Sequence, residues 1–255
     1  MPEKLRLLSL FAGIGGFELG LERSGYFETV AQCEIDPFCR RVLAKHWPDV
    51  RRYEDVRELT AAKLAADGIA VDAICGGFPC QDISVAGKGA GLGEGTRSGL
   101  WSEFARLISD IRPGVVFVEN VANLLSGPSD RPGAWFGRVL GDLATIRYDA
   151  EWHCIPASCV GLPHIRDRVW LVAYPWQERG QGEQSEALSW LRSVSWRENE
   201  RRASNFVARC NLHEPFLCKR RNGLSDELGA YGNAVVPQIP ELLGRAYGQA
   251  MLERH

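Results

Sequence analysis

The alternation of short apolar segments with amphipathic segments most restricts how this chain can fold. Apolar runs such as "LRLLSLF" and "GVVFVEN" are short and end near glycine or a polar residue, which is typical of buried strands. Longer segments such as "LWSEFARLISDI" carry apolar residues at helical spacing. Strands that alternate with helices predict an α/β fold with a mostly parallel sheet and helices on both faces.

The pattern assigns most of the chain to elements. The apolar runs predict strands at 5–11, 29–35, 71–77, 114–120, 148–155 and 167–174. The amphipathic segments predict helices at 16–25, 37–47, 100–111 and 135–146. Two segments interrupt the alternation. The glycine-rich stretch 84–99 is interpreted as a mobile lid, and the polar stretch 175–222 as a small binding subdomain or a partly disordered segment.

Composition narrows the class of protein. No apolar run approaches the ~20 residues of a membrane span, and the first residues lack the features of a signal peptide. We therefore expect a cytoplasmic protein with reduced cysteines and no membrane partner. The spacing of cysteines and histidines fits no common zinc pattern, so no metal is expected. The formal net charge of −2 gives no overall basic signal for nucleic acid, although Lys and Arg outnumber Glu between 176 and 222.

Glycines and acids gather where predicted strands end. The turn "FAGIGG" at 11–16 joins a strand to a helix and would let a ligand approach the backbone. Glu18 stands where a dinucleotide-binding turn has its third glycine, so a nucleotide turn and a plain turn both remain open. Glu34 follows the second strand, where an acid commonly holds a ribose. Asp55 is a second acid at this edge, suited to an adenine amino group, whereas Asp36 better fits a helix cap.

The stretch "GGFPCQ" places Cys80 just beyond the next predicted strand. Pro79 stiffens the backbone there, which favours a positioned nucleophile, although a buried structural thiol remains open. Glu119 ends the following strand at the same edge. A carboxyl group in that place suits thiolate attack on an electron-poor ring, because it can protonate or hydrogen-bond a ring nitrogen.

Six motifs together resemble those of the DNA (cytosine-5)-methyltransferases, in the family's order. They are "FAGIGGFELGLE", "CEID", "GGFPCQDIS", "FVENVANLL", "GLPHIRDRVWLVA" and "YGNAVVPQ". The resemblance implies a Rossmann-like methyltransferase fold with a seven-stranded sheet. It also implies a catalytic and cofactor-binding domain at 1–174, a reduced target-recognition segment at 175–222, and a C-terminal motif and helix at 223–255 that return to the catalytic domain.

The resemblance further implies S-adenosylmethionine as cofactor and assigns residues to three roles. Cofactor binding would fall to Phe11, Ala12, Gly13, Ile14, Gly15, Gly16, Glu34, Ile35, Asp55, Val56, Gly77, Pro79, Leu100, Asn233 and Ala234. Cys80 would attack carbon 6 of a cytosine flipped out of double-stranded DNA, with Glu119 on the N3 edge. Arg168 would contact the cytosine O2, and Arg166 would lie near the thiolate or the target phosphate. DNA contacts would come from Gln81, Ser84, Arg220 and Arg221.

The chain also departs from the family pattern. Its recognition segment is short, and "HIR" stands where the family usually has a Gln-Arg-Arg-like element. It resembles the compact methyltransferases of phages and prophages, which act in the cytoplasm of a bacterial host, and a monomer is expected. Three rival interpretations are a transfer-RNA cytosine-5 methyltransferase, a catalytically silent binding protein and a nicotinamide-dependent dehydrogenase. The Phe-Pro-Cys motif disfavours the first, the full set of motif residues the second, and the missing glycine the third.

Overall fold

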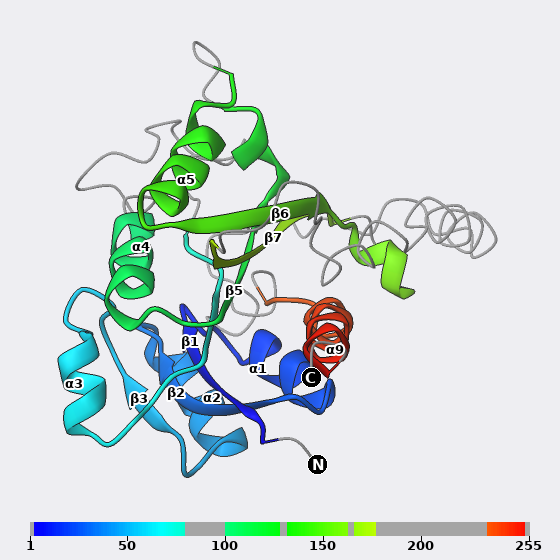
Figure 1. Ribbon diagram of the computed structural model, residues 1–255. Helices are drawn as coiled ribbons and strands as arrows, with labels where there is room; N and C mark the ends of the chain where they lie inside the picture. Colours follow the sequence, from blue (N-terminus) through cyan, green and yellow to red (C-terminus); the bar gives the residue numbers. More distant parts are fainter. Residues whose placement is uncertain (1–2, 80–99, 128–131, 163–165, 177–233, 253–255) are drawn as a thin grey trace, which may run out of the picture.

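The computed structural model describes residues 3–79, 100–127, 132–162, 166–176 and 234–252 (Figure 1). They form a seven-stranded sheet of order β3-β2-β1-β4-β5-β7-β6. The strands are β1 (Leu5–Leu10), β2 (Phe27–Cys33), β3 (Arg51–Tyr53), β4 (Ala73–Gly76), β5 (Val115–Val121), β6 (Tyr148–Cys154) and β7 (Arg168–Pro175). Pairing is parallel from β3 to β5, whereas β7 runs antiparallel to both β5 and β6. The mostly parallel, seven-stranded sheet is therefore confirmed.

Helices cover both faces of the sheet, as predicted (Figure 1). The α-helices are α1 (Gly16–Arg23), α2 (Pro37–His46), α3 (Ala61–Ala66), α4 (Leu100–Ile111), α5 (Ala134–Thr145) and α9 (Gln238–Leu252). Two short 3-10 helices are η2 (Ala122–Leu125) and η3 (Ala157–Val160). One core cluster holds side chains of α3, α4 and α5, and a second holds side chains of α1 and α9.

Helices α1 and α9 approach each other closely through glycines. A Cβ atom on Gly20 of α1 would lie 2.2 Å from the carbonyl oxygen of Pro237, just before α9. A Cβ atom on Gly248 of α9 would lie 2.2 Å from the ring of Tyr26. Real Cβ atoms do not approach so near, so larger residues at these two positions would force the two segments apart.

The sequence patterns missed two short elements, β3 and α3. β3 has three residues, of which Arg51 is exposed and Tyr53 is buried, so it offers no apolar run to detect. α3 begins after Thr60, whose side-chain oxygen accepts a hydrogen bond from the backbone N–H of Lys63 at 3.1 Å. Such a cap satisfies a free N–H at the helix start. Both elements lie at one edge of the sheet, and β3 carries the chain to the turn that contains Asp55.

Candidate active site

The glycine turn after β1 is shaped by residues in the left-handed backbone region. Phe11 has φ 53°, Gly13 φ 56° and Gly15 φ 92°. This conformation suits glycine, but a bulky residue such as Phe11 rarely adopts it, and strain of this kind gathers at functional sites. A Cβ atom on Gly16 would lie 2.4 Å from the carbonyl oxygen of Val235. The turn is therefore pressed against the segment that precedes α9, in which Ala234 also lies.

Glu34 links the glycine turn to the end of β2. Its Oε2 accepts a hydrogen bond from the backbone N–H of Gly13 at 2.7 Å, and its Oε1 accepts one from the N–H of Asp36 at 2.8 Å. The next side chain, Ile35, is 62% exposed, so an apolar surface lies open beside this carboxylate. Asp36 caps α2, as predicted, because its Oδ1 accepts a hydrogen bond from the N–H of Cys39 at 2.8 Å.

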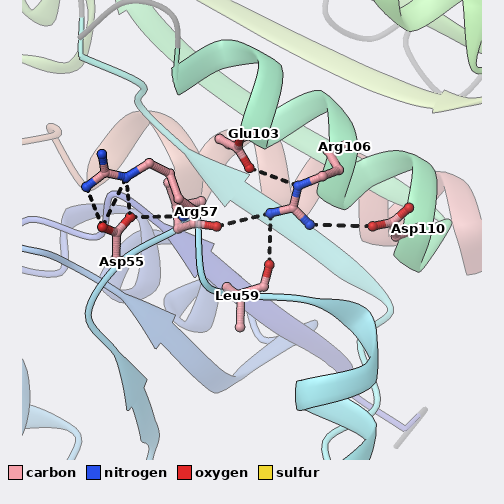
Figure 2. Close-up of polar contacts among 7 residues, drawn as sticks. Asp55, Arg57, Leu59, Glu103, Arg106 and Asp110 are labelled. Atoms are coloured by element: carbon pink, nitrogen blue, oxygen red, sulfur yellow. Dashed lines mark hydrogen bonds and ion pairs between the residues drawn. The ribbon is translucent and has the colours of Figure 1, made fainter. Parts of the chain in front are cut away.

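Asp55 follows β3 and is held by Arg57, a residue that belongs to none of the sequence motifs. Its Oδ1 accepts hydrogen bonds from the backbone N–H of Arg57 at 2.9 Å and from Arg57 Nε at 2.9 Å (Figure 2). The Arg57 hydrogen bond, opposed by partial burial, lowers the pKa of Asp55 below its ordinary value. The Asp-x-Arg spacing in the sequence could have indicated this ion pair. Val56, between them, is buried.

The carboxyl ends of β4 and β5, together with the start of β7, form the other half of this sheet edge. Glu119 on β5 is buried, and its Oε1 lies 3.0 Å from Nε of Arg168 on β7. A Cβ atom on Gly77, just beyond β4, would lie 3.1 Å from Oε2 of Glu119. The lack of a side chain at Gly77 therefore leaves the carboxyl group its space. Phe78 is tied to the same strand end, since its carbonyl oxygen accepts a hydrogen bond from Asn120 Nδ2 at 3.2 Å.

Burial and two neighbouring arginines shift the pKa of Glu119 in opposite directions. Burial raises the pKa of Glu119, while the positive charges of Arg168 and Arg166 oppose the rise. Burial and the charge of Arg168 lower the pKa of Arg166. The site thus holds a carboxyl group whose proton affinity is raised, next to two cationic groups. Such a group can hydrogen-bond or protonate a ring nitrogen.

The structure brings the described site residues to one edge of the sheet, because parallel strands end on the same side. From β1 to β5 these are Phe11 to Gly16, Glu34, Ile35, Asp55, Val56, Gly77, Pro79 and Glu119, with Arg166 and Arg168 at the start of β7 and Leu100 at the start of α4. Six expected residues lie outside the described residues: Cys80, Gln81, Ser84, Arg220, Arg221 and Asn233. The segments 84–99 and 177–222 lie there too.

One acid near the turn does not face the ligand edge. Glu18, in the first turn of α1, is fully buried, and its Oε1 accepts a hydrogen bond from Gln32 Nε2 at 3.1 Å. Among the described residues, no group of three or more His, Cys, Asp or Glu is placed to hold a metal ion. Within the same ranges, no helix has the length and apolar character needed to cross a membrane.

Comparison with known proteins gives a family match over most of the chain. A family model described as C-5 cytosine-specific DNA methylase matches residues 5–205. The Type II methyltransferase M2.BsuMI of Bacillus subtilis is 36% identical over 173 residues, which are 66% of this chain and 42% of that protein. The Type II methyltransferase M.Bsp6I of a Bacillus species is 32% identical over 171 residues, covering 67% of this chain and 52% of that protein. The match therefore spans about half the length of these relatives, or less.

Solved structures give the same picture of the fold. A prophage-encoded candidate DNA modification methyltransferase of E. coli has a TM-score of 0.56 and 25% identity, over 72% of this chain and 54% of that one. A Spodoptera frugiperda DNMT2 mutant has the same TM-score, with 19% identity, over 72% of this chain and 54% of that one. The second likeness concerns the fold alone.

Proposed function

Because the chain belongs to the C-5 cytosine-specific DNA methylase family, we propose that it transfers a methyl group from S-adenosylmethionine to carbon 5 of cytosine in duplex DNA. The ion pair between the buried Glu119 and the partly buried Arg168 carries this proposal. The pair lies at the same sheet edge as the glycine turn, with Gly77 against the carboxyl group. This arrangement suits a substrate ring that must be held and protonated on one edge while it is attacked from another.

The first half of the edge fits S-adenosylmethionine better than a dinucleotide. The N–H of Gly13 is already bound to the carboxylate of Glu34, and Asp55 adds a second carboxylate. A carboxylate on a backbone N–H of the glycine turn disfavours a pyrophosphate at that place. We propose that Glu34 binds the ribose hydroxyls, Asp55 the adenine amino group, and Phe11 and Ile35 the faces of the adenine.

The remaining proposed cofactor contacts surround these groups. They are the backbone of Ala12 to Gly16, Val56, Gly77, Pro79, Leu100, Asn233 and Ala234. Bound S-adenosylmethionine supplies an electrophilic methyl group. The close contact between Gly16 and Val235 supports a role for the C-terminal segment, because it brings Ala234 near the glycine turn.

The chain's own residues prepare the cytosine for methylation. The Cys80 thiolate forms a bond to carbon 6, and Glu119 hydrogen-bonds N3 and the amino group, which places electron density on carbon 5. Arg168 keeps Glu119 oriented and contacts O2, while Arg166 stabilises the thiolate or the target phosphate. After methylation, a base removes the proton from carbon 5, and the Cys80–carbon bond breaks to restore the aromatic ring.

Duplex DNA is proposed as the partner, with the cytosine flipped out of the helix, because its reacting atoms are otherwise stacked. Gln81 and Ser84 would face the DNA near the target, and the segment 175–222 would contact the duplex, with Arg220 and Arg221 on phosphates. The Type II methyltransferase relatives named above support DNA as the substrate.

The test supplies purified protein with labelled S-adenosylmethionine and, in separate reactions, unmethylated duplex DNA or transfer RNA. Modified cytosines are then located by bisulfite sequencing. We expect methylation of DNA alone, at a short recognition sequence. Cys80→Ser should abolish transfer and keep cofactor binding, measured by calorimetry. Methylation confined to transfer RNA, or full turnover by Cys80→Ser, would contradict the proposal.

A further inference from the structure

Arg106, on α4, connects this helix to the turn that follows β3. Its Nη2 donates hydrogen bonds to the carbonyl oxygens of Val56 at 3.1 Å and Leu59 at 2.9 Å (Figure 2). The turn is also closed by its own backbone, since the N–H of Leu59 bonds to the oxygen of Val56. One guanidinium nitrogen thus holds two carbonyls of a segment that is distant in sequence.

Two acids of the same helix orient the guanidinium. Arg106 Nε donates to Glu103 Oε2 at 2.8 Å, and Nη1 lies 3.5 Å from Asp110 Oδ2 (Figure 2). Because Nε and Nη1 contact these two acids, Nη2 points toward the turn. The planar guanidinium supplies donors in fixed directions, whereas a lysine ammonium is a single point charge on a flexible stem. Lysine in this place could not reach the two acids and both carbonyls at once.

The hydrogen bonds of Arg106 join two segments that would line the proposed adenine pocket. Asp55 and Val56 lie on the turn that Arg106 holds, and α4 begins at Leu100, which would form a second wall of the proposed pocket. Phe104 of α4 also stacks on Phe11 with a centroid distance of 6.3 Å. The spacing between α4 and the turn therefore sets the distance between the two walls.

We propose that Arg106 is a positioning residue that sets this spacing and so lets Asp55 discriminate the 6-amino group of adenine. The inference rests on the proposed function, because it requires the cofactor's adenine to lie between the turn and α4. Arg57 acts on a different part of the same turn. It binds the carboxylate of Asp55 directly, whereas Arg106 binds only backbone oxygens of the turn (Figure 2).

The test compares two ligands that differ at the 6-position of the base. Dissociation constants for S-adenosylhomocysteine and S-inosylhomocysteine are measured by calorimetry for the full-length wild-type protein, Arg106→Lys and Arg106→Gln. We expect both variants to bind S-adenosylhomocysteine roughly tenfold more weakly, the scale of one lost charge-assisted hydrogen bond. Binding of the 6-oxo ligand should change little, so the preference for the amino ligand should nearly vanish.

Arg245→Lys provides the matched control. Arg245 pairs with Glu241 four residues earlier on α9, at 2.7 Å, and this helix packs on α1 rather than on the turn. This variant should keep the wild-type preference. In methylation assays, Arg106→Lys should raise KM for S-adenosylmethionine more than it lowers kcat, since the cytosine side of the site is unchanged.

The outcomes separate this inference from the function on which it rests. An equal loss of affinity for both ligands, or an unchanged preference, would make Arg106 a structural residue only. If neither Arg106 variant folds, Arg106 would likewise be a structural residue only. A wild-type protein that binds neither ligand would remove the cofactor assignment, and the positioning role with it. A wild-type protein that methylates DNA, with an unchanged preference in the Arg106 variants, would overturn the positioning role alone.

Discussion

Replacing the buried Glu18 with glutamine should change how stability depends on pH. Burial raises the pKa of Glu18 from 4.5 to about 7, with a smaller contribution from the charge of Glu22 and opposing hydrogen bonds that include Ser9 and Gln32. Cys75 is also close enough to interact with its charge. Among the described residues, the buried oxygens Glu18 Oε2 and Gln32 Oε1 have no hydrogen-bond partner. A proton on Glu18 would add a donor beside these two acceptor oxygens.

The sign and size of this pH dependence follow from the linkage between proton binding and folding. Between the two pKa values the folded state holds a proton that the unfolded state has released, so stability falls as pH rises from about 4.5 to about 7. A shift of this size corresponds to about 3 kcal/mol when the group is fully ionised. A glutamine side chain in its place would carry no such penalty, because the amide keeps one acceptor and supplies two donors at every pH.

Urea unfolding followed by tryptophan fluorescence, from pH 5 to pH 8, measures this effect. The free energy of unfolding of Glu18→Gln minus that of the wild type should increase by about 2 to 3 kcal/mol over this range. A constant offset from altered packing does not matter, since the change with pH is the measured quantity. A difference that stays flat, or that falls as pH rises, would refute the idea that Glu18 is protonated in the folded protein near neutrality.

Three further predictions concern single contacts. Gly20→Ala should lower the free energy of unfolding by about 1 to 3 kcal/mol despite better helix propensity, because the new Cβ atom would lie 2.2 Å from a backbone oxygen. Gly137→Ala on α5, where the Cβ atom would meet open space, should raise the free energy of unfolding by about 0.5 to 1 kcal/mol. Changes of the same sign in urea unfolding of the two variants would contradict this prediction. Gly77→Ala should lower kcat more than cofactor affinity, since its Cβ displaces Glu119, and a calorimetric loss without a rate loss would oppose it. Asp36→Ala should cost about 1 kcal/mol through the lost α2 cap, and an unchanged midpoint in thermal unfolding would argue against it.

The sequence predicted the features that depend on short-range pattern. Strand and helix periodicity located most elements, and Asp36 before Pro37 was correctly interpreted as a cap. The sheet-edge position of Glu34, Asp55 and Glu119 followed from the rule that parallel strands end on one side. These positions agree with the structure, while the cofactor and substrate roles stay predictions.

What the sequence missed depends on packing between distant segments. β3 was not recognised because three residues carry no period, and its strand pairing comes from its neighbour β2. The role of Arg106 was hidden because its two carbonyl partners lie about fifty residues away and carry no side-chain signal. The sequence showed only that Glu18 stands where a dinucleotide-binding turn has its third glycine, whereas the structure buries it against Gln32 on β2. Which face of a short helix points inward is decided by what packs on it.

The packing of α9 on α1 has a consequence for how the protein is made. Within the part of the chain that the structure describes, the core cluster under α3, α4 and α5 uses residues no later than Ala173, whereas the opposite cluster also needs Ile239, Leu243 and Tyr247 of α9. Because a ribosome delivers α9 after the strands β1 to β7, the face under α3, α4 and α5 can acquire its cover during synthesis, while the face under α1 lacks part of its cover until α9 emerges. Limited proteolysis of stalled nascent chains ending before α9 should therefore cut α1 and spare α4. Equal protection of both helices would mean that the two faces do not form in this order.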